Sequence, residues 1–328
     1  MTWTIETWPK YWPMKEAFAI SRGSQDSTPT LQVKLTDAGG HVGFGEGCGI
    51  PYQGETPDTM TAQIDAVRAA IADGITRQSL LDLLPGGGAR FAIDSALWDL
   101  EAKRDGRNPF TVAGVAANPV DVDVTIGIRA PGDYEAAARK LSGYSVLKVK
   151  VDARDPIACI EGVRKGAPAA RLIIDPNQSW SVDMVKALGP QLKALGVALL
   201  EQPIKLGDEP GLDGYVPEVP LCADELIDTA DDLSKAKGRF QLINIKLDKC
   251  GGLTAGLALA DLAQAQGFGL MIGCMAGSSL SMAPGMVLAQ RCAFVDLDGP
   301  LLQSEDCEHG FDYDNGIVAV PHKPALWG

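Results

Sequence analysis

Hydrophobic and polar residues alternate in the stretch SVLKVKVDA at residues 145–153. The residues at 147, 149 and 151 are apolar and share one parity, whereas the other parity carries Lys148, Lys150 and Asp152. Because alternate residues of a strand point to opposite faces, the pattern predicts a strand with one apolar and one charged face. The charged face lies either in solvent or inside a larger structure.

Residues 119–299 show a longer repeating pattern, in which short β-rich runs alternate with Ala- and Leu-rich stretches that suit helices. Eight βα-like repeats predict a parallel barrel rather than an open sheet. Lys148 and Lys150 would then point into the barrel. The eight runs are residues 120–126, 145–152, 171–177, 196–203, 219–225, 240–247, 267–274 and 292–298.

The first 118 residues have a different pattern. TLQVKLTDAGGHVGFGEG reads as a hairpin that turns at residues 38–40, and two amphipathic stretches that each end at a glycine read as helices. We therefore expect an α+β capping domain at residues 1–118, joined by the loop-rich tail 300–328, and a catalytic barrel at residues 119–299.

Composition narrows the class of protein. A net charge of −13 excludes a protein that is basic overall, as proteins that bind nucleic acid or an anionic membrane surface often are. We find no uninterrupted apolar segment long enough to span a bilayer, and the N-terminus lacks the layout of a signal peptide. The seven cysteines form no CxxC pair and read as reduced thiols. These features predict a cytoplasmic protein.

Three predicted strands in succession end in a carboxylate: Asp175, Glu201 and Asp224. The carboxyl ends of barrel strands meet at one rim, so these side chains should converge there. Carboxylate oxygens suit a hard divalent cation such as Mg²⁺. The alternative is that each residue caps the helix that follows its strand.

Lysines are predicted on two opposite sides of the same rim. Lys150 lies near the end of the second strand and Lys246 ends the sixth, so they are diametrically opposed in a ring of eight. A ligand held on the metal would have a lysine on each side. A buried lysine near another cation has a lowered pKa, which lets it serve as a general base. The alternatives are solvated lysines, or structural salt bridges with Asp152 and Asp248.

The eighth strand ends in VDLDGP, and its two aspartates, Asp296 and Asp298, share one parity. They lie too far round the ring to join the metal ligands. A carboxylate pair in this place suits a substrate ammonium group, although one of the two could instead cap the following turn.

The motifs KVK, DPNQSW, EQP, ADE and NIKLDKCGG together resemble the enolase superfamily, in its muconate-lactonizing subgroup. GFGEG and AIDSALWDLEAK resemble the capping domain of that family, so the resemblance covers essentially the whole chain. It implies an α/β fold, a modified TIM barrel (β/α)7β with an α+β N-terminal capping domain, which is slightly shorter than a full eightfold repeat.

The resemblance implies a role for each motif residue. Asp175, Glu201 and Asp224 would be the Mg²⁺ ligands, with Asn177 and Glu225 supporting them from behind. Lys150 and Lys246 would be the two acid/base catalysts, and Lys148 would assist the substrate carboxylate. Histidines occur only at positions 41, 309 and 322, off the predicted strands, so the His–Asp dyad of the mandelate racemase branch is missing.

Within the subgroup, DLD on strand eight resembles the dipeptide epimerases, especially L-Ala-D/L-Glu epimerases, in which two aspartates hold the dipeptide's α-ammonium. AFAISRGSQDSTP resembles the mobile loop that closes over substrate. Arg22 in that loop would pair with a glutamate side chain, unless it is simply solvated. Thr125 faces either substrate or core. Many members carry a glutamate on strand seven, where this chain has Ala276 and Gly277.

The sequence thus predicts a Mg²⁺-dependent isomerase, a dipeptide epimerase that moves the α-proton between two opposed lysines. The alternatives on the same fold are an o-succinylbenzoate synthase, an N-acylamino acid racemase and a muconate cycloisomerase. Those of another class are a Schiff-base lyase and a non-catalytic binding protein. We expect a small-molecule partner, the dipeptide, and neither nucleic acid nor membrane. The dipeptide's C-terminal residue and homo-oligomerisation are left open.

Overall fold

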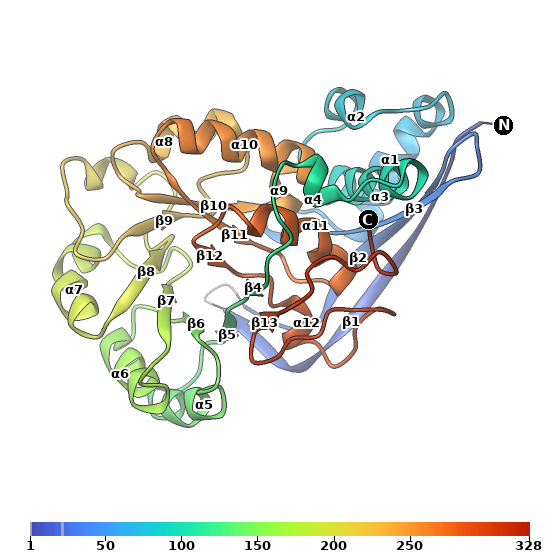
Figure 1. Cartoon of the computed structure of the whole chain (residues 1–328). Helices are drawn as coiled ribbons and strands as arrows, with labels where there is room; N and C mark the ends of the chain where they lie inside the picture. The colour runs from blue at the N-terminus through green and yellow to red at the C-terminus, as the bar shows by residue number, and fades with distance from the viewer. Residues whose placement is uncertain (1, 21–22) are drawn as a thin grey trace.

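The computed structural model describes residues 2–20 and 23–328. An N-terminal antiparallel sheet in the order β1-β2-β3 lies along one side of a parallel barrel whose outside carries helices (Figure 1). The predicted hairpin is confirmed, because β2 and β3 pair antiparallel from Thr36 opposite Val42. The sheet strands are β1 (Thr4–Ile20), β2 (Gly23–Thr36) and β3 (Val42–Cys48), and the helices of this part are α1 (Pro57–Ala72), α2 (Arg77–Leu83), α3 (Gly88–Asp105) and α4 (Pro109–Val112).

Helix α3 packs directly on β3, and glycines make this close approach feasible. A Cβ atom added at Gly43 or Gly45 would lie 2.1 Å from a carbonyl oxygen of α3, and one at Gly47 would lie 2.3 Å from another. No side chain fits at those distances. The glycines of GFGEG therefore let the helix lie on the sheet, where both elements contribute to one apolar cluster.

The barrel contains eight parallel strands in the order β5 to β12, so the predicted α/β barrel is confirmed. Its two edge strands meet at a seam, where the backbone N–H of Asp123 donates to the Val295 carbonyl at 2.9 Å. The strands are β5 (Val124–Ile126), β6 (Val146–Lys150), β7 (Arg171–Asp175), β8 (Val197–Glu201), β9 (Leu221–Ala223), β10 (Leu242–Lys246), β11 (Gly269–Gly273) and β12 (Phe294–Val295).

The barrel helices vary in length. After β8 and β9 the connections are mostly irregular, with only single turns of 3-10 helix and the four-residue α8, whereas α11 runs through Pro284 in the segment after β11. The helices are α5 (Tyr134–Lys140), α6 (Pro156–Gly166), α7 (Val182–Ala194), α8 (Leu233–Ala236), α9 (Leu247–Cys250), α10 (Leu253–Ala265), α11 (Ser279–Ala289) and α12 (Gly299–Leu302). Across the described chain, no helix combines the length and apolarity that crossing a membrane requires.

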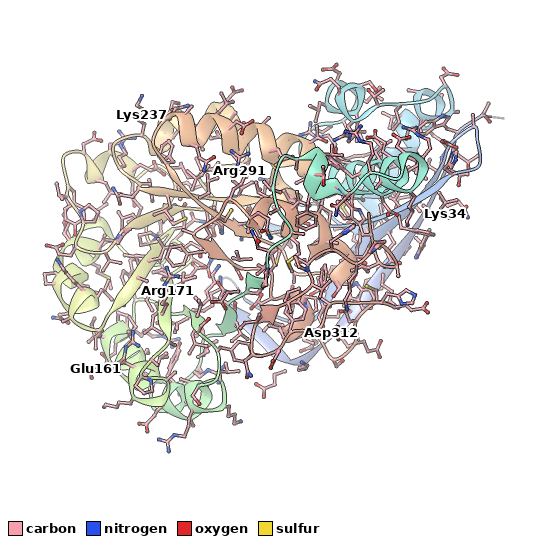
Figure 2. The ribbon with its side chains drawn as sticks, in the orientation of Figure 1. Lys34, Glu161, Arg171, Lys237, Arg291 and Asp312 are labelled. Carbon is pink, nitrogen blue, oxygen red and sulfur yellow. The ribbon has the colours of Figure 1, made fainter. Side chains whose placement is uncertain are left out.

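Inward-pointing apolar side chains fill the amino-terminal half of the barrel. On this layer Arg171, which Figure 2 labels, places its guanidinium 4.5 Å from the centre of the Phe294 ring. With this half of the barrel filled by side chains, the carboxyl ends of the strands are the place where a parallel barrel binds ligands. The members of the layer are Val146, Ile173, Leu199, Cys222, Met271 and Phe294.

The first predicted barrel run differs from the expectation, because it is split into two short strands. β4 (Val120–Asp121) pairs antiparallel with β13 (Ile317–Val318) of the C-terminal tail, and only β5 joins the barrel. The tail also reaches the N-terminal part, where Trp327 Nε1 donates to the Ser95 carbonyl at 2.9 Å. The tail thus touches both parts, and the boundaries at residues 118 and 299 stay predictions.

Candidate active site

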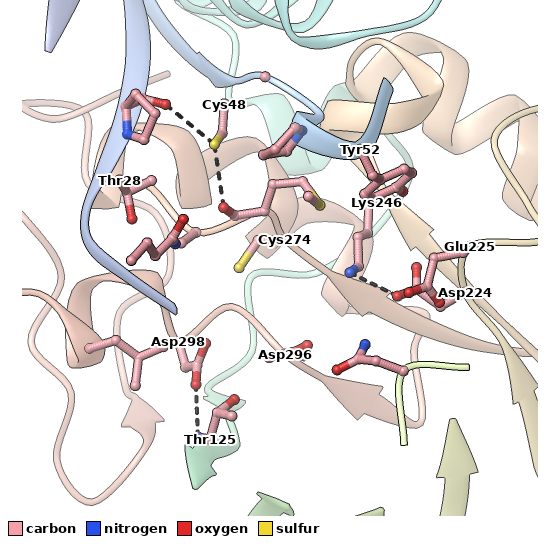
Figure 3. A pocket seen from close by; sticks show the side chains of 18 of the residues that line it. Thr28, Cys48, Tyr52, Thr125, Asp224, Glu225, Lys246, Cys274, Asp296 and Asp298 are labelled. Atoms are coloured by element: carbon pink, nitrogen blue, oxygen red, sulfur yellow. Dashed lines mark hydrogen bonds and ion pairs between the residues drawn. The ribbon is translucent and has the colours of Figure 1, made fainter. Parts of the chain in front are cut away.

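A cavity of about 440 Å³ opens where the carboxyl ends of the barrel strands face the N-terminal sheet. The capping part contributes Cys48, Tyr52 and the segment around Pro29, and the barrel contributes charged side chains from most of its strands. In Figure 3, Asp298 and Thr125 lie on the opposite side of the opening from Lys246 and Asp224. The cavity therefore has two chemically distinct ends.

The predicted metal ligands occupy neighbouring strand ends. Asp175 ends β7, Glu201 ends β8 and Asp224 directly follows β9, and all three are almost completely buried. Asn244, two residues before Lys246, donates from Nδ2 to Glu201 Oε1 at 2.8 Å and so fixes that carboxylate. The strand-end placement is the one expected, whereas the ligand role itself stays a prediction.

Each of these carboxylates is paired with a lysine. Lys148 Nζ lies 2.8 Å from Glu201 Oε2 and 3.3 Å from Asp175 Oδ2, and Lys150 Nζ lies 2.5 Å from Asp175 Oδ2. On the other side of the ring, Lys246 Nζ is 2.9 Å from Asp224 Oδ2. Because Lys148 and Lys150 are at most 8% exposed, the charged face of this strand lies inside the barrel.

The alternative prediction, in which the lysines form salt bridges with Asp152 and Asp248, was wrong. Asp152 binds the guanidinium of Arg154 instead, at 2.6 Å. Asp248 accepts the backbone N–H groups of Cys48, at 3.0 Å, and of Met275, at 3.1 Å. Asp248 thus fastens the end of β3 and the segment after β11 to the turn that follows Lys246. Burial raises the pKa of its carboxyl to about 7, although those backbone bonds oppose the shift.

Burial and ion pairing act in opposite directions on the lysines. Burial lowers the pKa of Lys246, but the Asp224 carboxylate more than offsets this, and the pKa lies well above its ordinary value. The pKa of Lys148 is raised in the same way, chiefly by Asp296 and Glu201 against burial. In this arrangement the lowered pKa that we expected of a general base is therefore not found at Lys246, because a carboxylate pairs with it.

The carboxylate set fits a hard divalent cation by its chemistry. Glu201 Oε2 and Asp224 Oδ1 are buried oxygens that accept no hydrogen bond, although lysine ammonium groups lie within ion-pair distance of both. Burial raises the pKa of Glu201 to about 7, with Lys148 opposing the shift. A buried carboxylate oxygen with an unused lone pair is the donor that Mg²⁺ takes.

Two further residues contact the predicted metal ligands, and the sequence analysis gave no role to either: Asn244 contacts Glu201, and Lys249 contacts Asp224. Lys249 Nζ lies 3.1 Å from Asp224 Oδ1 and donates to the Ile227 carbonyl at 2.7 Å, so it ties the Asp224 loop to α9. Both residues stand inside the motif NIKLDKCGG, and Asn244 shares the inward parity of Lys246. That parity was the available signal.

The opposite end of the cavity is built by strand eight. Asp296 Oδ2 accepts from Lys148 Nζ at 2.6 Å, and Asp298 Oδ2 accepts the backbone N–H of Thr125 at 2.8 Å. Asp298 makes no side-chain cap to α12, so the capping alternative does not hold for it. Between the two ends, Met275 and Ala276 line an uncharged wall.

Asn177 and Glu225 both line the cavity beside the metal-ligand candidates, and their supporting role stays a prediction. Arg22 lies outside the described residues, so its pairing with a substrate side chain stays a prediction.

The carboxyl of Asp298 makes the stability of the protein depend on pH. Burial, and then Asp296, raise its pKa from an ordinary 3.8 to about 7. Between those values the folded state holds more protons than the unfolded state, so the free energy of unfolding falls as pH rises. We expect Tm in a chelating buffer to fall from pH 5 to pH 8, and Asp298→Asn to flatten that fall. A variant whose Tm profile ran parallel to that of the wild type would contradict this.

Two family models match this architecture part by part. The N-terminal domain of mandelate racemase / muconate lactonizing enzyme matches residues 2–109, and the enolase C-terminal domain-like model matches residues 133–326. The chain belongs to the mandelate racemase / muconate lactonizing enzyme family. The predicted enolase-superfamily membership is thereby confirmed.

Members of this family similar to the chain include epimerases and racemases. L-Ala-D/L-Glu epimerase of Escherichia coli (strain K12) is 37% identical over 316 residues, which is 95% of this chain and 98% of that protein. N-acetyl-D-glutamate racemase of Pseudoalteromonas sp is 38% identical over 283 residues, which is 85% of this chain and 90% of that protein. These relatives are isomerases.

Solved structures of the family agree with the fold. An enolase family member from Agrobacterium tumefaciens with homology to dipeptide epimerases, with bound sodium and L-Ala-L-Glu, is 38% identical with a TM-score of 0.96. The match covers 99% of this chain and all of that one. Two dipeptide epimerase structures at 26% and 29% identity are complexes with Mg and a dipeptide.

Proposed function

We propose that the chain is a Mg²⁺-dependent dipeptide epimerase of the L-Ala-D/L-Glu type, which inverts the α-carbon next to the substrate's terminal carboxylate. The observation that carries the proposal is the placement of Lys150 and Lys246. They end β6 and β10, four strands apart in a ring of eight, and both face the cavity. A substrate between them has an amine on each face.

Two opposed lysines suit a 1,1-proton transfer better than a one-sided elimination. One neutral amine accepts the α-proton, and the opposite ammonium donates a proton to the other face, which inverts the carbon. Lys148 Nζ lies among the carboxylates between these two bases, where it can hydrogen-bond to the substrate carboxylate as charge develops on it.

Asp175, Glu201 and Asp224 would hold the divalent ion. Mg²⁺ bound there would supply Lewis-acid stabilisation of the negative charge on the substrate carboxylate. The support for this assignment is the set of three buried carboxylates on consecutive strand ends, with buried oxygens on Glu201 and Asp224 that accept no hydrogen bond. Asn177 and Glu225 line the same wall and would keep these carboxylates in place.

The other end of the substrate would meet Asp296 and Asp298. With the carboxylate of a dipeptide bound at the metal end, its free α-ammonium extends toward this pair, and Thr125 lies beside it. Met275 and Ala276 add no charge to the wall between the two ends. The second residue of the dipeptide is therefore not selected by a charged group of that wall.

Racemisation of an N-acylamino acid is a second candidate function, which the similarity to N-acetyl-D-glutamate racemase supports. Such a substrate has no ammonium group, and neither do the substrates of o-succinylbenzoate synthase and muconate cycloisomerase. None of these substrates would bring a positive charge to Asp296 and Asp298. A Schiff-base lyase would instead trap substrate on a lysine with borohydride and be indifferent to EDTA.

Free dipeptides such as L-Ala-L-Glu are expected to turn over, and N-acetylated ones to be poorer by orders of magnitude in kcat/KM. A charge-assisted pair between ammonium and carboxylate in a closed site is worth roughly 2–4 kcal/mol. The measurement is deuterium incorporation from D₂O across a library of free and acetylated dipeptides with Mg²⁺, read by mass spectrometry. Asp296→Asn and Asp298→Asn on the free dipeptide avoid the bulk of the acetyl group. If an N-acylated amino acid proves the best substrate, the dipeptide assignment is wrong.

A further inference from the structure

The buried carboxylate of Asp123 has no role in the reaction described above. It is completely shielded from solvent, and neither of its oxygens accepts a hydrogen bond. Its backbone is held at the seam of the barrel by the bond to Val295. Asp123 shares the parity of Thr125, so its side chain belongs to the barrel interior, one step deeper than Thr125.

Asp123 forms a compact group with the two aspartates of strand eight. One carboxyl oxygen from each of Asp123, Asp296 and Asp298 lies within 4.8 Å of the other two, and no other such group of three occurs in residues 2–20 and 23–328. Because 4.8 Å is the upper limit of these separations, a point midway between the three oxygens lies within about 2.8 Å of each, which is the usual length of an N⁺–H···O⁻ hydrogen bond. A primary ammonium has three such donors.

The positive charge near this group does not balance it. Of the three carboxylates, Lys148 forms an ion pair with Asp296, with its Nζ 2.6 Å from Asp296 Oδ2. The same ammonium also forms ion pairs with Glu201 and Asp175. The backbone N–H of Thr125 occupies one oxygen of Asp298. Burial, and then the carboxylates of Asp296 and Asp298, raise the pKa of Asp123 well above its ordinary value, so this buried carboxyl holds a proton when no cation is near. A cation placed between the three carboxyl groups would take the place of that proton.

We propose that Asp123, Asp296 and Asp298 form a three-carboxylate site for a monovalent cation. With substrate present the occupant is the primary α-ammonium of the dipeptide, and without substrate it is K⁺, which proteins also bind through oxygen atoms. Asp296 and Asp298 line the cavity, so the cation reaches Asp123 between them. The part that concerns the ammonium depends on the proposed function, whereas cation binding by the substrate-free protein does not.

The first test needs no substrate. Tm is measured in a chelating buffer with KCl, methylammonium chloride or tetramethylammonium chloride at equal ionic strength. Tetramethylammonium has no N–H donor and is too wide for the site. A cation that binds only the folded state raises Tm, so K⁺ and methylammonium should raise it above the tetramethylammonium value by about 2 °C or more.

Variants decide whether that shift arises at Asp123. Asp123→Asn should abolish it. Asp121→Asn is the matched control and should keep the shift, because Asp121 is an exposed residue of β4, two positions before Asp123, and its carboxylate accepts the Ser145 hydroxyl. Equal Tm values in the three salts for the wild type would overturn the proposal. So would an undiminished shift in Asp123→Asn.

The second test concerns the substrate. Asp123→Asn should raise KM for L-Ala-L-Glu by about tenfold or more, the size of one lost charge-assisted hydrogen bond, with a much smaller change in kcat. K⁺ should inhibit the wild type competitively. An unchanged KM in an active variant would refute the role of Asp123 in substrate binding and leave the proposed function standing. A wild type that turns over no dipeptide but shows the Tm shift would refute the proposed function and leave the cation site standing.

Discussion

Lys150→Ala and Lys246→Ala are each expected to abolish epimerisation of L-Ala-L-Glu, by about 10³-fold or more, while α-proton exchange survives with one epimer only. General acid–base groups contribute roughly 10²–10⁴-fold, and the full inversion needs both of them. Lys150 Nζ and Lys246 Nζ approach from β6 and β10 on opposite sides of the ring. Each variant therefore keeps the lysine that exchanges the proton of one stereoisomer, and the two variants should keep opposite isomers.

The measurement is ¹H NMR of L-Ala-L-Glu and L-Ala-D-Glu, each incubated separately in D₂O with each variant. Lys237→Ala is a suitable control, because Lys237 is an exposed lysine on the outer surface, labelled in Figure 2. The control should exchange and epimerise both substrates as the wild type does. Loss of exchange with the same isomer in both active-site variants would refute two bases on opposite faces.

Removal of the divalent ion is expected to cost more than about 10²-fold in kcat/KM, since charge stabilisation at the developing anion is usually the largest part of such a rate enhancement. EDTA followed by gel filtration should remove the activity, and Mg²⁺ should restore it. Glu201→Gln should weaken binding of Mn²⁺, measured by calorimetry, and lower turnover together, because Glu201 Oε2 is one of the buried oxygens without a hydrogen bond.

Glu161→Gln is the matched control for Glu201→Gln, because Glu161 is exposed on α6, on the outer surface of the barrel. It should change neither Mn²⁺ affinity nor turnover. Full activity of the chelated wild type would contradict the assignment of Asp175, Glu201 and Asp224 as ligands of a required ion.

Much of the site could be predicted from the sequence because strand parity and strand ends are local properties. Lys148 and Lys150 alternate with apolar residues, and Asp175 and Glu201 close their strands, so a parallel barrel alone brings these side chains to one rim. The same parity rule would have placed Asp123 inside the barrel.

Contacts between distant segments could not be predicted in this way. The split of the first barrel run depends on β13, which lies nearly two hundred residues further along the chain and pairs with β4. The partners of Asp248, the backbone N–H groups of Cys48 and Met275, come from the capping sheet and from the segment after β11. The raised pKa of Lys246 follows from a distance to Asp224 that only the folded barrel sets.

The central claim is that two lysines invert the α-carbon of a dipeptide, and one measurement tests it most directly. L-Ala-L-Glu is incubated with the wild-type protein and Mg²⁺ in D₂O, and ¹H NMR follows the α-proton of the glutamate residue and the formation of L-Ala-D-Glu. We expect the α-proton signal to disappear while the two epimers approach comparable amounts, starting from either one. An α-proton that persists in both epimers, with no interconversion, would contradict the account.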